Sequence, residues 1–245
     1  MQINEYSSLP PADIDKDRIK EETKAYCKEI AEWQEKLYAQ GEHSILIVLQ
    51  GMDAAGKSST IRDVFRYVNP MGIHTKSFKK PTEEEFAHDF LWRVHAHTPK
   101  KGMIAIFDRS HYEDILIQRV HNWIDHERVE KRMGYINNFE SLLHEEANTT
   151  ILKFFLHISK EEQEKELDER RTQADKRWKH NDNDWKEREH WDEYMRAYED
   201  VFKNCSPQFP WTIVPANKSW YKRYIVAKTL CEKMRSMNLQ WPKPV

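Results

Sequence analysis

The chain has 245 residues, and its 39 lysines and arginines nearly balance its 41 aspartates and glutamates, which gives a formal net charge of −2 at pH 7. This balance argues against a general nucleic-acid or membrane binder, for which an excess of basic residues is expected. The length is sufficient for one large α/β domain with a full hydrophobic core.

Helical periodicity and short apolar runs alternate along the chain. Amphipathic spacing predicts helices at residues 14–40, 57–67, 82–98, 112–121, 126–147 and 219–237. Apolar runs, the second of which is the weakest, predict strands at residues 44–49, 75–78, 103–107, 151–158 and 211–214. Strands that alternate with helices indicate an α/β fold, with a central, mostly parallel five-stranded sheet and helices on both faces.

Local signals mark the ends of some of these helices. Gly41 suits the left-handed residue that often ends a helix, and Asn69-Pro70 should stop the helix that begins near Lys57. Thr82 and Glu85 have the spacing of a capping box, so a helix should begin there.

Residues 160–200 are dense in charges of both signs and have no run typical of a strand. Most segments of this kind are solvated helical hairpins with a few aromatic anchors. The alternative, which we favour because of the motifs described below, is a charged helical lid over a binding site. We expect a single domain over residues 1–245, with an N-terminal helical extension at 1–42 and the lid at about 160–200.

Residues 51–58 fit the phosphate-loop pattern G-x-x-x-x-G-K-[ST] and lie between an apolar run and a predicted helix. Gly51 and Gly56 allow the backbone to fold around a phosphate so that successive N–H groups point inward. Lys57 adds a positive charge, and the hydroxyl of Ser58 can bind Mg²⁺. The alternative is a strand–turn–helix connection that binds no ligand.

Asp53 is unusual inside a phosphate loop, because a carboxylate repels phosphate. One interpretation is that its side chain stabilises the turn, as Asp often does. The other is that it helps to hold Mg²⁺, or faces the acceptor phosphate across the metal ion.

Asp108 and Arg109 directly follow the strand predicted at 103–107. Because the carboxyl ends of parallel strands meet at one edge of a sheet, we expect Asp108 beside the phosphate loop. There it can bind Mg²⁺ directly or through water, while Arg109 can hold a phosphoryl group with two hydrogen bonds. The commoner alternative for such a pair is a helix N-cap followed by a surface arginine. The predicted ligands of Mg²⁺, or alternatively of Mn²⁺, are Asp53, Asp108 and Ser58.

Several blocks of the sequence resemble the family-2 polyphosphate kinases. They are GMDAAGKSS, SFKKPTEEEFAHDFLWRVH, IFDRSHYEDILIQRVH, the pattern of Trp178-Lys179, Asp184, Arg188 and Trp191, and PWTIVPANKSWYKRYIV. The resemblance implies a P-loop kinase fold, a three-layer sandwich with a helical lid. It also implies Mg²⁺-dependent phosphoryl transfer between inorganic polyphosphate and nucleoside mono- or diphosphates such as AMP, ADP, GMP and GDP.

The resemblance and the chemistry of the side chains together point to individual roles. The candidate catalytic residues are Asp53, Lys57, Asp108 and Arg109. The candidates for binding phosphate or polyphosphate are Gly51, Ala55, Gly56, Ser58, Ser59, Lys79, Lys80, Arg119, Arg171, Lys179, Lys218 and Arg223. The candidates for binding nucleotide are Phe86, Trp92, Arg93, Glu113, Asp184 and Arg188. Many family members have Asp or Gly after the Walker lysine, so Ser58-Ser59 leaves the exact metal ligation open.

Polyphosphate is a linear polyanion, so its site needs a row of cations rather than a single cradle. Lys79 and Lys80 beside Pro81, and Arg170-Arg171 in the predicted lid, are the preferred candidates. Most other cationic residues are expected to be solvated surface charges.

Some aromatic and histidine residues have a structural interpretation as well. Phe86 and Trp92 can contact a base, although aromatic residues at helical spacing are more often part of a core. The histidines at 95, 97, 111 and 121 lack a spacing typical of metal ligands, and we interpret them as structural.

Two other functions stay open. An ATP-dependent nucleoside monophosphate kinase of the thymidylate kinase type also combines a phosphate loop with an Asp-Arg pair, but it does not need a cationic lid. A non-catalytic protein that binds nucleotide or polyphosphate is the second alternative, and the complete set of catalytic candidates argues against it.

The cysteines and the termini bear on location. Cys27, Cys205 and Cys231 are odd in number and widely spaced, which predicts free thiols in a reducing cytosol. The first residues lack the pattern of a signal peptide, and no run approaches the roughly 18 apolar residues of a membrane span. We expect a cytoplasmic enzyme whose partners are polyphosphate and purine nucleotides, not nucleic acid or membrane. Family resemblance suggests a homodimer or homotetramer.

Overall fold

The computed structural model describes residues 2–205 and 207–243 of the chain. The predicted domain 1–245 therefore includes a few positions, 1, 206 and 244–245, that lie outside the described residues. Five strands form one sheet: β1 (Ser44–Gln50), β2 (Ile73–Ser77), β3 (Ile104–Asp108), β4 (Thr149–His157) and β5 (Trp211–Pro215). The α-helices are α1 (Lys16–Gln40), α2 (Lys57–Val64), α3 (Glu83–Ala87), α4 (Trp92–His95), α5 (Glu113–Val120), α6 (His126–Ala147), α7 (Lys160–Thr172), α8 (Asp182–Glu189), α9 (Trp191–Asn204) and α10 (Ser219–Ser236). Short 3-10 helices lie at η1 (Ile3–Glu5), η2 (Pro70–Gly72) and η3 (Arg177–Lys179).

The strands run parallel in the order β2-β3-β1-β4-β5, which confirms the predicted five-stranded parallel sheet. β1 lies at its centre and every one of its residues is buried, as expected for a strand covered on both faces. The register pairs Leu49 with Asp108, so the chain leaves β1 and β3 side by side at one edge of the sheet. This register brings the phosphate loop next to the acidic residue that ends β3.

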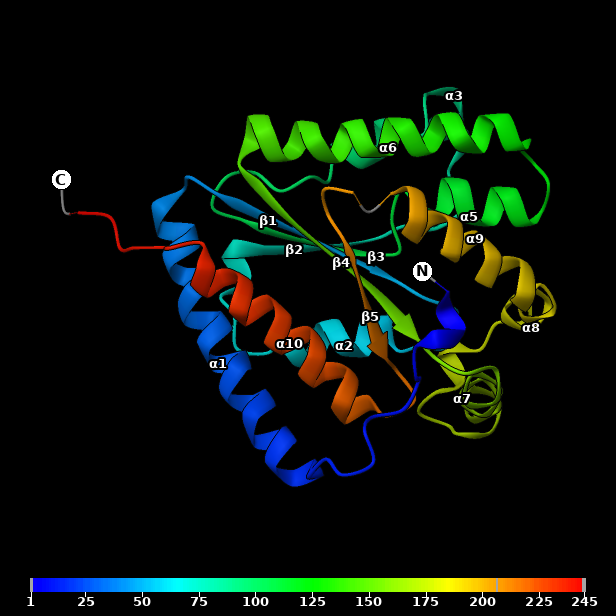
Figure 1. Ribbon diagram of the computed structural model, residues 1–245, viewed down its shortest axis with the longest axis horizontal. Coiled ribbons are helices and arrows are strands. Elements are labelled where there is room, and N and C mark those ends of the chain that lie inside the picture. Colours follow the sequence, from blue (N-terminus) through cyan, green and yellow to red (C-terminus); the bar gives the residue numbers. More distant parts are fainter. Residues whose placement is uncertain (1, 206, 244–245) are drawn as a thin grey trace.

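Helices cover both faces of the sheet, as predicted for a three-layer sandwich. Figure 1 shows α5 and α6 on one side and α1, α2 and α10 on the other, with α7 and α8 beyond the carboxyl ends of the strands. The predicted extension at residues 1–42 contains α1, which packs against α10. Asp15 caps the start of α1 by accepting hydrogen bonds from the backbone N–H groups of Asp17 and Arg18, and Gly41 ends it with φ 63°.

The single helix predicted at 82–98 is wrong, because the structure has two short helices there. Thr82 and Glu85 form the predicted capping box at the start of α3. His88 is then extended, and Asp89 Oδ1 accepts hydrogen bonds from the N–H groups of Leu91 and Trp92. This side chain competes with the helical hydrogen bonds and starts a new turn, α4. The helix predicted at 57–67 also ends earlier, at Val64.

The charged segment predicted as a lid at 160–200 contains α7, η3, α8 and most of α9. Helix α9 differs from the other elements of this segment, because Trp191, Tyr194 and Tyr198 are buried in the main hydrophobic core. The ring of Tyr198 lies 4.5 Å from that of Phe155 in β4, measured between centroids. The part of the segment that stands over the strand ends is therefore residues 160–190.

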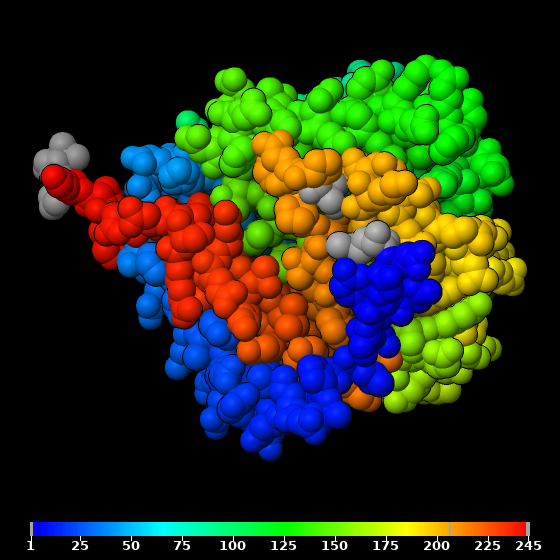
Figure 2. All heavy atoms as spheres, in the orientation of Figure 1, coloured from blue at the N-terminus to red at the C-terminus, as the bar shows by residue number. Residues whose placement is uncertain are grey.

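The N-terminal residues lie on the molecular surface beside these elements. Figure 2 shows them between the α7 region and α10. The Ile3 N–H donates to Glu199 Oε1 in α9 at 2.8 Å, and the Asn217 N–H donates to the Ser8 carbonyl at 3.0 Å. No helix among the described residues is long and apolar enough to cross a membrane. The three cysteines are buried and unpaired.

Candidate active site

The phosphate loop connects β1 to α2, as its sequence predicts. Gly51 has φ 144° and Gly56 has φ 87°, and a Cβ at Gly51 would lie 2.8 Å from the Leu156 carbonyl oxygen. Both positions therefore require glycine. The buried Lys57 donates hydrogen bonds from Nζ to the carbonyl oxygens of Gly51 at 2.7 Å and Met52 at 3.1 Å. These bonds hold the first part of the loop closed around the lysine.

A cavity of about 530 Å³ lies over this loop. Its walls come from the phosphate loop, the end of β3, α7, η3 and the first turn of α10. The predicted site residues that line it are Asp53, Gly56, Lys57, Ser58, Ser59, Asp108, Arg109, Lys179 and Arg223. The structure thus brings together parts of the phosphate loop, the Asp-Arg pair, the lid and Arg223 of α10.

Asp108 and Ser58 both line this cavity and contact each other. The hydroxyl of Ser58 donates to Asp108 Oδ2 at 2.8 Å. A hydroxyl and a carboxylate at this spacing suit Mg²⁺, which usually takes few protein ligands and completes its octahedron with water and phosphate oxygens. Among the described residues, no three or more His, Cys, Asp or Glu side chains cluster as a metal site. The oxygen ligands that Asp108 and Ser58 offer at the cavity therefore fit a Mg²⁺ ion that is bound together with a phosphate.

Asp53 pairs with Arg109 rather than standing alone in the loop. Arg109 donates through Nη2 to Asp53 and through Nη1 to Glu113 Oε2 at 3.2 Å. Burial alone would raise the pKa of Asp53, but Arg109 and Lys57 hold that pKa below its ordinary value. Glu113 and Asp53 in turn raise the pKa of Arg109, which stays a cation. The sequence did not indicate this pair, which neutralises the carboxylate that would otherwise repel phosphate.

Arg109 has φ 63°, a left-handed conformation that is uncommon for residues other than glycine. Its N–H donates to the Leu49 carbonyl at 3.0 Å, immediately before the phosphate loop. The turn after β3 is thus tied to the end of β1. We interpret the local strain as the cost of aiming the guanidinium at the cavity.

The lid contributes cations to the cavity, and a buried acid of the lid, Asp184, holds one of them. Arg170 lines the cavity and donates through Nη1 to Asp184 Oδ2 at 2.8 Å. Burial, together with the negative charge of Asp53, raises the pKa of Asp184 to about 6. Lys176 and Trp178 also line the cavity, and Trp178 is 77% exposed. The Nζ of Lys179 lies 4.9 Å from the Trp178 ring centroid.

Some predicted phosphate-binding residues lie outside the lining of this cavity. Arg119 forms an ion pair with Asp200 at 2.6 Å and joins α5 to α9. Arg171 lies 5.7 Å from the Trp185 ring centroid, while its neighbour Arg170 faces the cavity. The others outside the lining are Gly51, Ala55, Lys79, Lys80 and Lys218.

Three predicted nucleotide-binding residues lie in the lid or beside the Asp-Arg pair without lining the cavity: Glu113, Asp184 and Arg188. Arg188 donates to the Lys160 carbonyl at 2.8 Å and to Gln163 Oε1 at 3.1 Å, which joins α8 to α7. Glu113 holds Arg109 as described above. Their positions support the shape of the site, and their contact with nucleotide stays a prediction.

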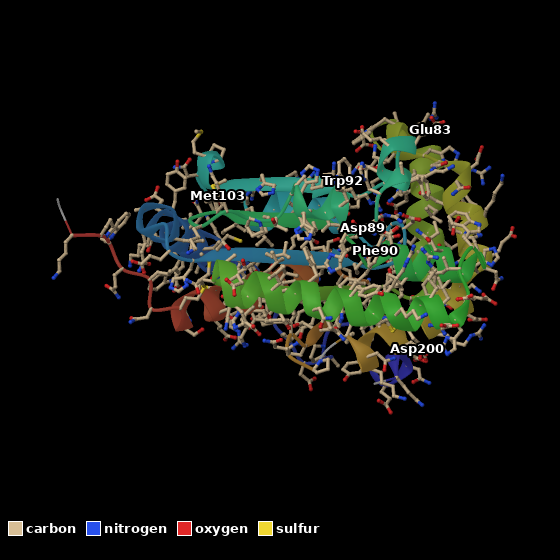
Figure 3. The ribbon with its side chains drawn as sticks, turned by 90° about the horizontal axis from the view of Figure 1, so that it is seen from above. Glu83, Asp89, Phe90, Trp92, Met103 and Asp200 are labelled. Atoms are coloured by element: carbon tan, nitrogen blue, oxygen red, sulfur yellow. The ribbon has the colours of Figure 1, made fainter. Side chains whose placement is uncertain are left out.

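A second, larger cavity of about 1340 Å³ lies between the α3–α4 segment and α5 and α6. Phe86 and Arg93 line it, and Phe86 is 54% exposed. Figure 3 shows Asp89, Phe90 and Trp92 close together beside α6. Trp92 stacks on His88 with ring centroids 4.1 Å apart and does not belong to the lining.

The floor of this second cavity is polar. Arg93 is 6% exposed and donates through Nη2 to Asp114 Oδ2 at 3.1 Å. Gln118 donates to Asp114 Oδ1 at 2.7 Å and accepts from Arg132 Nη1 at 2.8 Å. Asp114 and Gln118 follow Glu113 in α5, so one helix contributes to the walls of the second cavity and holds Arg109 at the first.

Sequence reasoning did not single out Lys222, which is buried behind the phosphate loop. Its Nζ donates to the Ala55 carbonyl at 2.6 Å. The residue lies next to the predicted Arg223 and four positions after Lys218. Its place on the face of a helix shared with Lys218 was the one signal available in the sequence. The histidine at 111 is buried and faces Glu140 at 3.4 Å, in keeping with a structural role.

Comparisons with known proteins agree with this geometry. A family model described as Polyphosphate kinase 2 (PPK2) matches residues 13–242. The AMP/ADP-polyphosphate phosphotransferase of Meiothermus ruber is 48% identical over 212 residues, which cover 86% of this chain and 79% of that protein. The ADP-polyphosphate phosphotransferase of Rhodopseudomonas palustris is 39% identical over 241 residues, which cover 93% of this chain and 83% of that protein. The crystal structure of polyphosphate kinase 2 from Arthrobacter aurescens TC1 superposes with a TM-score of 0.89 at 41% identity, covering 100% of this chain and 93% of that one.

Proposed function

The chain belongs to the polyphosphate kinase 2 family, and from this premise we propose that it transfers a phosphoryl group between inorganic polyphosphate and nucleoside mono- or diphosphates. It is a phosphotransferase, as its relatives are. The observation that carries the proposal is the meeting of the phosphate loop, Asp108 and Arg109 under cations of the lid, around a single cavity. The relatives named above, with AMP/ADP and ADP in their names, support adenine nucleotides as acceptors. A relative from Corynebacterium glutamicum, 27% identical and named a putative GDP-polyphosphate phosphotransferase, supports guanine nucleotides more weakly.

The terminal phosphoryl group of polyphosphate is proposed to bind in the phosphate loop. The N–H groups of the loop and the start of α2 attract anions, because unpaired N–H groups and the helix dipole point at them. Lys57 and Arg109 line the same cavity and can neutralise charge that develops on the transferred group. The rest of the polyanion would follow Arg170, Lys176 and Lys179 on the lid, which are lining residues as well.

No nucleophilic side chain is needed for this reaction. An oxygen of the acceptor's terminal phosphate attacks in line, and the site contributes position and charge. Arg109, held between Asp53 and Glu113, lies where it can orient that acceptor phosphate. The lid keeps water away from the phosphoryl group, which favours transfer to the nucleotide over hydrolysis.

Asp108 and Ser58 are the residues that would hold Mg²⁺, or Mn²⁺ in its place. Such a cation would offset the negative charge of the phosphates. Asp53 is ion-paired with Arg109, so the structure supports its metal contact less than it supports those of Asp108 and Ser58. Removal of divalent cations with EDTA should abolish turnover, and Mg²⁺ added in excess should restore it.

The nucleoside of the acceptor is proposed to bind in the second cavity. Helix α5 lines the second cavity with Asp114 and Gln118 and holds Arg109 of the first through Glu113. We propose on this basis that an acceptor phosphate near Arg109 belongs to a nucleotide whose base lies beside Phe86. In this cavity Arg93 and Gln118 hold the carboxylate of Asp114, and the exposed face of Phe86 offers stacking to a base.

Phe86→Ala should therefore raise the KM for AMP and ADP by about 5- to 150-fold, because base stacking on an aromatic ring is worth about 1–3 kcal/mol. The KM for polyphosphate should stay within about a factor of two of the wild-type value. Tyr67→Ala, which removes an exposed aromatic side chain outside the lining of both cavities, is the matched control. Steady-state kinetics with each substrate varied in turn would measure both constants. An unchanged KM for nucleotide would remove Phe86 from the acceptor site.

The experiment that tests the function compares phosphoryl donors. The protein is incubated with Mg²⁺, polyphosphate and, separately, AMP, ADP, GMP, GDP or dTMP, and the phosphorylated nucleotide is quantified. We expect product with polyphosphate and purine nucleotides. Product that forms only when ATP replaces polyphosphate would instead support the nucleoside monophosphate kinase, and no product with either donor would support a binding protein.

A cytoplasmic homodimer or homotetramer completes the proposal. Multi-angle light scattering of the purified chain measures the assembly directly, and a monomer would contradict this part of it.

A further inference from the structure

Lys222 is a buried lysine that lies behind the phosphate loop and has no role in the function proposed above. Its side chain projects from the first turns of α10, 167 residues away in sequence from the loop residue that it contacts. Only 3% of the residue is exposed. A buried ammonium loses its hydration and needs a compensating role or partner. The partner here is a backbone carbonyl of the phosphate loop, not a carboxylate.

The contacts of Lys222 fix the second half of the loop. Its Nζ donates to the Ala55 carbonyl at 2.6 Å. The side chain also fills the space beside Gly56, where an added Cβ would collide with Nζ and lie 3.3 Å from Cε. Gly56 is required by its φ of 87°, and its missing side chain leaves room for the Lys222 ammonium beside it.

Lys222 complements Lys57, which holds the first half of the same loop. Lys57 donates to the carbonyls of Gly51 and Met52, and Lys222 donates to the carbonyl of Ala55. In a trans peptide the C=O and the following N–H point in opposite directions. Holding the Ala55 carbonyl against Lys222 therefore turns the N–H of Gly56 away from Lys222, and Gly56 lines the cavity.

We propose that Lys222 is a positioning residue for the phosphoryl donor, which orients the Ala55–Gly56 peptide so that the loop binds the terminal phosphate of polyphosphate. The proposal rests on the proposed function, because it assigns the phosphate loop to the donor. Lys222 does not line the cavity, so it acts through the loop and not by contact with substrate.

The charges around Lys222 give the proposal a pH signature. Burial lowers the pKa of Lys222 to about 8, with Arg223 of α10 and Lys57 of α2 acting in the same direction and Glu166 of α7 opposing them. The ammonium is therefore present below about pH 8 and is lost as the pH rises through that value. A neutral amine is a weaker donor to the Ala55 carbonyl, so the KM for polyphosphate should rise above pH 8 in the wild-type protein.

The test compares Lys222→Met, Lys222→Arg and the control Lys228→Met, which alters an exposed lysine of the same helix. Steady-state constants for polyphosphate and for ADP are measured from pH 6.5 to 9.5, well below the melting temperature of each variant. Loss of a charged hydrogen bond to the loop should raise the KM for polyphosphate about 10-fold or more in Lys222→Met at pH 7. The KM for ADP should stay within about a factor of three. Lys222→Arg, which keeps its charge at every pH tested, should restore most of the donor affinity and lose the rise above pH 8.

Each other result counts against the proposal. If Lys222→Met melts at a lower temperature but keeps wild-type kinetic constants, the residue is only structural. If its KM values for donor and acceptor rise together, the loop is disturbed as a whole and Lys222 has no specific link to the donor. Wild-type protein assayed in parallel separates these outcomes from failure of the proposed function, since a wild-type chain without polyphosphate-dependent turnover would show that the function itself is wrong.

Discussion

The sheet fixes the position of Asp108, and its contact with Ser58 suggests a substitution that tests its role. Asp108 ends β3 in register with Leu49 of β1, and its carboxylate accepts a hydrogen bond from the hydroxyl of Ser58. An asparagine at this position keeps the shape and an oxygen that can accept from Ser58, but it removes the negative charge proposed to hold Mg²⁺. The substitution therefore separates charge from structure.

We expect Asp108→Asn to lower kcat by at least about 100-fold, the loss typical when one electrostatic group of an active site is removed. The melting temperature should change by only a few degrees, because the shape of the side chain is retained. Coupled assays with polyphosphate and ADP measure the first quantity and calorimetry the second. Asp192→Asn, at an exposed position in α9, is the control. Undiminished turnover in Asp108→Asn would exclude Asp108 from metal binding.

Some residues of the candidate site could be predicted from a short stretch of sequence, and others depend on contacts between distant parts of the chain. Gly51, Gly56 and Lys57 could be predicted because the geometry of a phosphate loop is set within eight consecutive residues. The pair of Asp53 and Arg109 could not, because its partners are 56 residues apart and their meeting depends on the register of β1 and β3. The contact of Lys222 with the loop is of the same kind, over a larger separation.

At the scale of elements, the strands and most helices were predictable and the lid was less so. The strands β1, β3 and β4 are short apolar runs, and their burial confirms the pattern that predicted them. The strand β2, the weakest of the predicted runs, has no fully buried residue. In α7 the sequence has little apolar periodicity, so the phase of the helix was not readable. With 3.6 residues per turn, a change of one position rotates a side chain by about 100°. The sequence therefore could not decide between Arg170 and Arg171, of which Arg170 lines the cavity.

The lid carries an acid whose titration can be measured through stability. Asp184 in α8 has a pKa of about 6 in the folded protein, above its ordinary value of 3.8, because of burial and the nearby Asp53. Folding therefore favours the protonated form. The contribution of Asp184 to stability is fully present below about pH 4 and is lost as the pH rises to about 6.

Asp184→Asn should remove this dependence. The free energy of unfolding of the wild-type protein, minus that of Asp184→Asn, should fall between about pH 4 and pH 6 and then become constant. Urea titrations at intervals of half a pH unit give these values. Glu189→Gln, an exposed change on the same helix, should show no such fall. A constant difference for Asp184→Asn across the range would mean that Asp184 has an ordinary pKa in the folded protein.

At the scale of the whole molecule, a buried polar network joins the sheet to the helices behind the site. Lys153 in β4 is fully buried and donates to Glu140 Oε2 of α6 at 2.6 Å, to the Tyr112 hydroxyl at 2.9 Å and to the Cys205 carbonyl at 2.6 Å. Tyr112 in turn donates to Glu140 Oε1 at 2.8 Å. Burial would raise the pKa of Glu140, but its hydrogen bond from His111 and the charge of Lys153 hold it below the ordinary value.

This network connects the core to the chemistry through the chain itself. His111 and Tyr112 follow Arg109 within three residues, so the buried carboxylate holds the turn that carries the Asp-Arg pair. The sequence predicted neither Lys153 nor Glu140 as a partner, because a lysine in an apolar run and a glutamate in a long charged helix each look solvated. Their pairing depends on the packing of α6 against β4.

Removing one partner of the Lys153–Glu140 pair should lower the free energy of unfolding far more than replacing both partners with apolar side chains. Lys153→Met and Glu140→Leu should each lower the free energy of unfolding by about 3–5 kcal/mol, because each leaves a buried charge without its partner. The double variant should be destabilised by clearly less than the sum, since two apolar side chains leave no unpaired charge. Lys131→Met, which breaks an exposed pair with Glu127 on the same helix, should cost less than about 1 kcal/mol. Urea unfolding of the five proteins measures all these values. Additive losses in the double variant would show that the two charges do not stabilise one another, and that the tyrosine and backbone contacts hold the turn without them.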